Sequence, residues 1–215
     1  MLPRLFCLVG PADDLSVLPE LARLGVRGFQ VRAKHEVVPL ADRDILSLAR
    51  SVVAAVRPHG ATVVVDDRVD VALAAGADGV HLGALDLPVA DARALAPGLL
   101  VGATCRDADD VRRAADDGAD YAGLGPVFDT VSKPGLPPAL GLEAVTAATG
   151  SLPLLAIGGI DAARARQARA AGAHGVAVIG APWRQPDPLH AARELLDAVA
   201  CAAGARPGST CSGPG

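Results

Sequence analysis

The sequence lacks a long hydrophobic run and an excess of positive charge. None of its apolar runs reaches the roughly 20 residues of a transmembrane helix, and the stretch after Met1 turns acidic at Asp13, before a signal-peptide core could form. We therefore expect a cytoplasmic protein with no membrane partner. The formal net charge of -4 gives no overall attraction to nucleic acid, so any anion must be bound by a local cluster of cations.

Cysteine and glycine motifs of common cofactor sites are also missing. The four cysteines, Cys7, Cys105, Cys201 and Cys211, are scattered without the spacing of a zinc site or a disulfide framework. The G-x-G-x-x-G fingerprint of dinucleotide-binding sheets is absent after the first apolar run. A reactive thiol at Cys105 has no assigned base, which favours a small buried side chain there.

What the sequence does contain is a repeated helix-to-strand junction. A helix-like segment ends in a glycine, where a left-handed residue terminates a helix, and a short apolar strand follows. The phrase occurs four times, as LARLGVRGFQVR from Leu21, ALAAGADGVHLG from Ala72, AADDGADYAGLG from Ala114 and ARAAGAHGVAVIG from Ala168.

Further strand-length runs and helical patterns fill the intervals between these junctions. The runs cover 5–9, 61–66, 99–104 and 152–157, and the helical patterns include 42–56, 107–115, 161–171 and 188–203. Eight alternating units predict an α/β fold, a single-domain (β/α)8 TIM barrel over residues 1–203, rather than an open doubly wound sheet. Small polar residues and turn formers at 204–215 predict a flexible tail.

Polar side chains fall at the ends of the predicted strands, where a barrel of this kind has its active site. Gln30, Arg32 and Lys34 occupy alternate positions at the second strand and suit an anion. Unrelated charges on a solvated edge are the alternative, but a closed barrel has no edge. We favour the anion site.

Carboxylates follow the next two strands. Asp66 and Asp67 end the third strand and Asp86 lies just beyond the fourth, where two carboxylates and a phosphate would suffice for Mg2+. Helix caps before Arg68 and Pro88 explain Asp67 and Asp86 about equally well. His81 in the fourth strand is more often a satisfied core residue than a catalyst.

The last four strands end in hydroxyl or glycine groups that suit a phosphate. Thr104 ends the fifth strand, and the loop after the sixth carries Thr130, Ser132 and Lys133. Glycines after the seventh and eighth strands allow close approach of backbone N–H groups to a phosphate. These glycines are Gly158, Gly159 and Gly180.

From Leu5 to Ala200 the chain resembles the thiamine phosphate synthase family. The resemblance rests on QVRAK, DDRVDVALAAGADGVHLGALD, GATC, YAGLGPVFDTVSK, AIGGI and GVAVIGA, in that order. It implies a transferase that joins 4-amino-5-hydroxymethyl-2-methylpyrimidine pyrophosphate to thiazole phosphate, releasing pyrophosphate, with Mg2+ as cofactor. A homo-oligomer is compatible with the sequence.

The resemblance also implies residue roles. Gln30 would face the pyrimidine, and the Gln30 to Lys34 segment, with Val31 and Ala33, would contact this substrate together with Asp66. The cations Arg32, Lys34 and Lys133, with Thr104, would hold the pyrophosphate and stabilise its departure, while Asp67 and Asp86 would bind the metal. The thiazole phosphate would be held by Thr130, Val131, Ser132, Gly159, Ile179 and Gly180.

Three positions depart from the family pattern. Thr104 stands in place of a serine and Ser132 in place of a threonine, so both keep a hydroxyl. Asp66 stands in place of an asparagine and brings a negative charge next to a pyrophosphate.

Two alternatives are open. A thiazole phosphate tautomerase on the same barrel would need no pyrophosphate clamp and would carry a histidine just after Thr104, where this chain has Cys105 and Arg106. A non-catalytic phosphate-ligand sensor would need no metal pair. This chain keeps the metal pair Asp67 and Asp86 and the residues of the pyrophosphate clamp, which are Gln30, Arg32, Lys34 and Lys133. Their presence favours the transferase.

Overall fold

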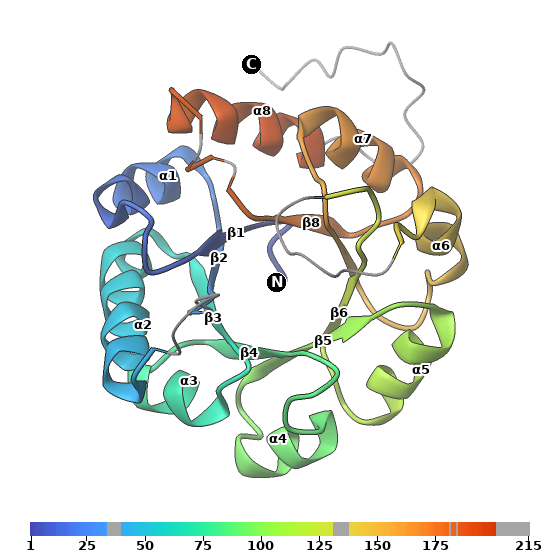
Figure 1. Cartoon of the computed structure of the whole chain (residues 1–215), viewed down its shortest axis with the longest axis horizontal. Coiled ribbons are helices and arrows are strands. Elements are labelled where there is room, and N and C mark those ends of the chain that lie inside the picture. The colour runs from blue at the N-terminus through green and yellow to red at the C-terminus, as the bar shows by residue number, and fades with distance from the viewer. Residues whose placement is uncertain (34–39, 131–137, 181, 184, 201–215) are drawn as a thin grey trace.

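The strands of the chain close into a barrel. In the computed structural model, which describes residues 1–33, 40–130, 138–180, 182–183 and 185–200, eight parallel strands pair in chain order and β8 returns to β1 (Figure 1). The strands are β1 (Leu5–Val9), β2 (Gly28–Val31), β3 (Thr62–Asp66), β4 (Gly79–Leu82), β5 (Leu100–Cys105), β6 (Tyr121–Leu124), β7 (Leu154–Ile157) and β8 (Gly175–Val178). The predicted TIM barrel is confirmed.

Helices surround the barrel on its outside (Figure 1). They are α1 (Leu18–Leu24), α2 (Asp42–Val56), α3 (Val69–Ala75), α4 (Val89–Leu95), α5 (Ala108–Asp116), α6 (Gly141–Ala147), α7 (Ala162–Ala170) and α8 (Pro188–Ala200), with short 3-10 turns at Leu15–Val17 and Arg57–His59. Asp107 and Asp161, predicted as the first helical residues, instead cap α5 and α7 by accepting from the N–H groups of Asp110 and Arg164.

Two apolar cores follow from the period of two along each strand. The larger core packs between strands and helices, and Cys7 and Val9 of β1 belong to it. The smaller core contains the alternate residues inside the barrel, among them Phe6, Val64 and Tyr121. The buried side chains of the inner core do not occupy the carboxyl ends of β2, β3 and β5, where polar side chains lie.

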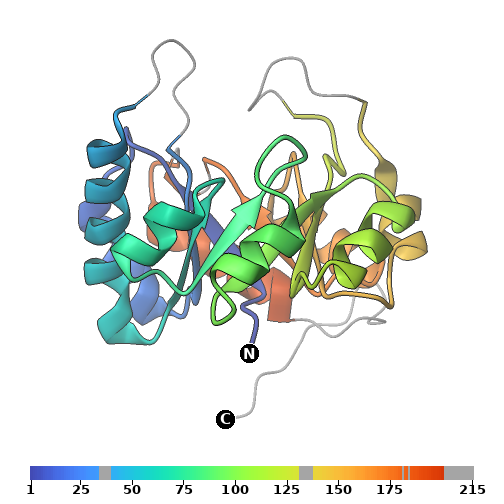
Figure 2. The same cartoon turned by 90° about the horizontal axis from the view of Figure 1, so that it is seen from below.

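The strands all run in one direction. In Figure 2 the N-terminus lies below the barrel, so the strands begin there and end at the upper face. Residues 201–203 of the expected domain and the expected tail at 204–215 lie outside the described residues. Within the part of the chain that the model describes, no helix has the length and apolar character of a membrane span.

Candidate functional site

A cavity of about 290 Å³ lies at the carboxyl ends of the strands. Its wall includes six polar residues that the sequence singled out: Gln30, Arg32, Asp66, Asp67, Thr104 and Thr130. These residues lie at or just after the ends of β2, β3 and β5 and in the loop after β6. The barrel therefore brings together side chains up to 100 residues apart in the sequence.

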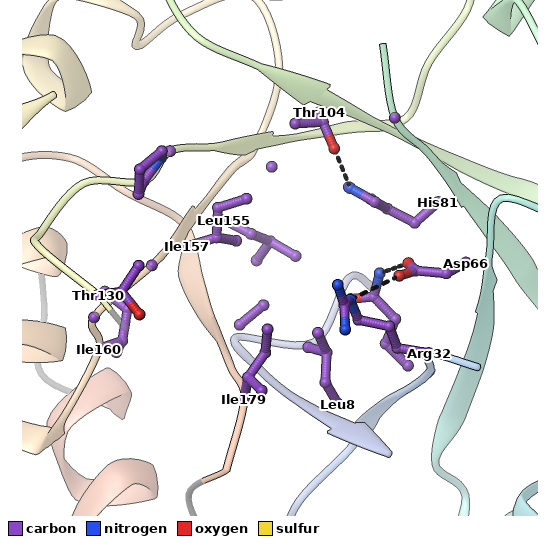
Figure 3. Close-up of a pocket in the computed structure, with 18 of the residues that line it drawn as sticks. Leu8, Arg32, Asp66, His81, Thr104, Thr130, Leu155, Ile157, Ile160 and Ile179 are labelled. Carbon is purple, nitrogen blue, oxygen red and sulfur yellow. Dashed lines mark hydrogen bonds and ion pairs between the residues drawn. The ribbon is translucent and has the colours of Figure 1, made fainter. Parts of the chain in front are cut away.

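The cavity has two polar sides separated by apolar side chains. In Figure 3 Arg32, Asp66, His81 and Thr104 lie on one side and Thr130 lies on the other. Leu155 and Ile157 of β7 lie between them, and Leu8 and Ile179 complete the apolar wall. Such a shape suits a ligand or ligand pair with polar groups at its ends and a flat apolar middle.

Asp66 is paired with two residues expected to contact substrate. The side-chain amide of Gln30 donates to Asp66 Oδ1, and Arg32 Nε lies 3.7 Å from Asp66 Oδ2. The side chain of Asp66 is only 9% exposed, so these contacts are weakly screened. The carboxylate is therefore a counter-ion of Arg32 as well as a neighbour of any bound anion.

Asp67 has a left-handed backbone, with φ of 65°. Its N–H donates to His81 O over 2.8 Å, and the next N–H, of Arg68, donates back to Asp66 O over 2.7 Å. This tight turn directs Asp67 into the cavity wall. The residue capping α3 is Arg68, so the helix-cap alternative for Asp67 is wrong.

Asp86 lies in the turn after β4. Its Oδ2 accepts from the N–H of Gly83 over 2.6 Å, and the residue capping α4 is Pro88, so the cap alternative is wrong here too. Gly83 contributes to the cavity wall, whereas Asp86 does not. Over the described ranges, no group of three or more His, Cys, Asp or Glu residues is arranged around a metal position.

This donor set fits Mg2+ better than a metal that needs a full protein cage. Mg2+ keeps several waters and takes one or two carboxylates together with substrate phosphate. Asp67 forms part of the cavity wall, and Oδ2 of Asp86 accepts from the N–H of Gly83. The hard oxygen donors match the cation that the resemblance implies.

Glycines shape the side of the cavity opposite Arg32. Gly159 has φ of 66°, and a Cβ there would lie 2.5 Å from Asp129 O, so only glycine fits. Gly159 and Ile179 form part of the wall, and Arg164 Nη1 donates to Gly159 O over 2.7 Å. Gly180, also with positive φ, is buried and forms no part of the wall.

Other predicted contact residues lie off the cavity wall or outside the described residues. Val31 is fully buried in the core between strands and helices because it alternates with Gln30, so its side chain faces away from the cavity. Ala33 is half-buried and forms no part of the wall. Lys34, Val131, Ser132 and Lys133 lie outside the described residues.

Two polar residues of the wall, His81 and Tyr121, were not among the predicted site residues. His81 and Tyr121 line the deep end of the cavity, where His81 lies within hydrogen-bonding distance of both Tyr121 and Thr104. A histidine in an apolar strand carried too little signal by itself, because its partners are 40 and 23 residues away.

The model of the family described as "Thiamine monophosphate synthase" matches residues 5–181. The chain belongs to this family. Curated relatives include the thiamine-phosphate synthase of Salinispora arenicola, 49% identical over 176 residues that cover 80% of this chain and 83% of that protein. Membership places the chain among enzymes that condense pyrimidine and thiazole moieties in thiamine biosynthesis.

A longer relative and a solved structure extend the comparison. The bifunctional protein ThiM/ThiE of Symbiobacterium thermophilum is 48% identical over 203 residues, which are 93% of this chain but 42% of that protein. The thiamine phosphate pyrophosphorylase of Pyrococcus furiosus superposes with a TM-score of 0.81 at 32% identity and covers 92% of this chain and 95% of its own. A 3-hexulose-6-phosphate synthase, at 24% identity and a TM-score of 0.69, shares the fold.

Proposed function

We propose that the chain joins 4-amino-5-hydroxymethyl-2-methylpyrimidine pyrophosphate to thiazole phosphate in a Mg2+-dependent reaction that gives thiamine phosphate and pyrophosphate. The observation that carries this proposal is the cavity with Arg32 beside Asp66 and Asp67 on one side, an opposite side shaped by glycines, and an apolar strip between them. Two flat heterocycles fit the strip and two anionic groups fit its ends. The names of the synthase relatives contain the same product, thiamine phosphate.

The side of the cavity with Arg32 would hold the leaving group. Arg32, together with Lys34 and Lys133 as the resemblance implies, would stabilise the charge that develops on pyrophosphate as the carbon–oxygen bond breaks. Thr104 would donate a further hydrogen bond to it. A Mg2+ held by Asp67 and Asp86 would neutralise part of the same charge when bound.

The opposite side would hold the thiazole phosphate. Thr130, Ser132 and the backbone around Gly159 and Gly180 would bind this phosphate and direct the thiazole nitrogen at the methylene carbon of the pyrimidine. No side chain has to act as a strong base, because the nitrogen attacks with its own lone pair. Positioning of the two substrates then supplies much of the rate enhancement.

The deciding experiment is incubation of the purified protein with both substrates, with and without Mg2+, followed by chromatography for thiamine phosphate. We expect product only with both substrates and Mg2+. Full turnover in excess chelator would contradict the metal assignment, and absence of product with bound substrates would favour the phosphate-ligand sensor.

The tautomerase alternative is separable in the same assay. The thiazole phosphate tautomer offered alone should remain unchanged, because the histidine of a tautomerase is missing just after Thr104. Arg106, the second residue after Thr104, donates to backbone oxygens of Gly125 and Pro138. Isomerisation of the thiazole without the pyrimidine substrate would support the tautomerase instead.

A further inference from the structure

The hydroxyl of Thr104 is connected to the interior of the barrel through two buried side chains. His81 Nε2 lies 3.0 Å from Thr104 Oγ1, and His81 Nδ1 lies 3.1 Å from the hydroxyl oxygen of Tyr121. His81 is 9% exposed and Tyr121 is 1% exposed. Figure 3 shows the His81 ring directed at Thr104 from the neighbouring strand.

The surrounding strands leave room for these two rings and little more. A Cβ on Gly102 would lie 2.1 Å from Cζ of Tyr121, and a Cβ on Gly123 would lie 2.9 Å from Cε1 of His81. On its other side the Tyr121 ring stacks on Phe6, with ring centroids 6.0 Å apart. Packing therefore fixes both rings, and their polar atoms have to be satisfied where they are.

The hydrogen of the Tyr121 hydroxyl sets the direction of the whole chain of bonds. Burial raises the pKa of Tyr121, so the hydroxyl keeps its hydrogen. Within the described part of the chain, the only hydrogen-bond partner found for this hydroxyl is His81 Nδ1. Nδ1 must then accept, because a protonated Nδ1 would leave the tyrosine hydrogen without an acceptor.

A neutral imidazole that accepts at Nδ1 carries its hydrogen on Nε2. Nε2–H therefore donates to Thr104 Oγ1, and the hydrogen of Thr104 is left to point into the cavity. If this hydrogen bond ran in the opposite direction, Thr104 would donate to Nε2 of His81 and would present only lone pairs to an anionic ligand.

We propose that Tyr121 and His81 are positioning residues that hold His81 as the Nε2–H tautomer and thereby fix Thr104 as a hydrogen-bond donor to the substrate pyrophosphate. The identity of the ligand rests on the proposed function, whereas the tautomer is a property of the protein alone. The two can therefore fail separately.

The tautomer is measured first, without substrate. The protein is labelled with 15N-histidine, and the signals of His81, one of five histidines, are assigned by comparison with His81→Gln. At pH 7.5 we expect Nε2 to carry the hydrogen and Nδ1 to be an acceptor. In Tyr121→Phe the Nδ1–H tautomer should gain population. An Nδ1–H or doubly protonated ring in the unsubstituted protein would overturn the proposal, and so would an unchanged spectrum in Tyr121→Phe.

The consequence for substrate binding is measured next. If the donor orientation of Thr104 falls to about a third of molecules in Tyr121→Phe, KM for the pyrophosphate substrate should rise about threefold, with kcat little changed. In a Thr104→Val background, Tyr121→Phe should have no further effect on KM. Independent, multiplicative effects of the two changes would contradict the proposal. If the unsubstituted protein forms no product, the proposed function fails while the tautomer result stands.

Phe6→Leu is the matched control, because it loosens the packing of Tyr121 and leaves its hydroxyl in place. We expect a lower Tm with the tautomer and KM retained. The same change of tautomer and KM as in Tyr121→Phe would show that packing, and not the hydroxyl, is responsible, and would overturn the proposal.

Discussion

Asp66 stands where the resemblance implies an asparagine, and in the structure its carboxylate has Arg32 as a partner. The carboxylate accepts from Gln30 and lies 3.7 Å from Arg32 Nε. A bound pyrophosphate has to compete with it for Arg32. The cost is smaller than that of an unpaired carboxylate, because the pair neutralises itself in the free protein.

We predict that Asp66→Asn lowers KM for the pyrophosphate substrate while kcat changes little. An amide removes the repulsion and frees Arg32 for the leaving group, and a net gain of about 1 kcal/mol in substrate binding corresponds to about a fivefold lower KM. Steady-state kinetics at saturating Mg2+ measure it. Asp91→Asn, the same change of charge on the exposed surface of α4, should leave KM unchanged. A higher Mg2+ requirement in Asp66→Asn would identify a metal ligand instead.

Arg32 is predicted to act on the leaving group and not on the thiazole phosphate. Arg32→Ala should lower kcat/KM by about a hundredfold or more, because it removes a charge-assisted hydrogen bond that strengthens as pyrophosphate departs. Arg43→Ala, on the exposed face of α2, is the control. If the loss appeared only in KM for thiazole phosphate, the two sides of the cavity would have to be exchanged in the proposal.

Sequence patterns could predict which single residues line the cavity where the position repeats from strand to strand of the barrel. Strand-end positions such as Arg32, Asp67 and Thr130 could be predicted because every strand of such a barrel ends at the same face. The Tyr121–His81–Thr104 chain could not, since its contacts depend on how three strands are staggered and on space left by Gly102 and Gly123.

At the scale of elements, strand starts were displaced by local backbone bonds. The run at 152–157 was predicted to begin two residues before β7, but Pro153 has no N–H to donate to a sheet. The run at 99–104 was predicted to begin one residue before β5. The N–H of Leu99 donates to Ala96 O and closes the turn after α4, so it is not part of the sheet. Helix α2, with a long amphipathic pattern, matched its prediction at both ends.

The turn between β3 and α3 allows the carboxylate of Asp67 to be removed without loss of the fold. An L-residue in a left-handed backbone costs roughly 1 kcal/mol, which is about what glycine loses in chain entropy. We therefore predict that Asp67→Gly has a Tm within a few degrees of the parent and requires a much higher Mg2+ concentration for half-maximal rate. Thermal unfolding and a Mg2+ titration measure the two effects.

Asp67→Ala serves as the counterpart, since alanine has neither the carboxylate nor the freedom of glycine. It should have the same Mg2+ requirement and a lower Tm. An unchanged Mg2+ requirement in both variants would remove Asp67 from the metal site.

At the scale of the whole molecule, the two described cysteines report on the integrity of the barrel. Cys7 and Cys105 are 0% and 1% exposed, and burial raises the pKa of each thiol to about 12. At pH 8 such a thiol is deprotonated in about one molecule in ten thousand. The expectation that Cys105 is a buried side chain is confirmed.

We predict that a Cys201→Ser, Cys211→Ser variant reacts with thiol reagents only as fast as the barrel unfolds. Absorbance of the released chromophore, followed across a denaturant series, should give a rate that tracks loss of circular dichroism. Fast labelling of the native variant, with activity retained, would show local opening around one of the two thiols.

The left-handed turn at Asp67 also has a genetic consequence. Glycine and asparagine, the residues that tolerate this backbone best, are each one nucleotide away from both codons for aspartate. A lineage carrying this gene can therefore lose the carboxylate in a single mutation and still make a folded barrel. If Asp67→Gly keeps its Tm as predicted, the backbone of this turn gives no reason for aspartate, and the reason has to lie in the negative charge.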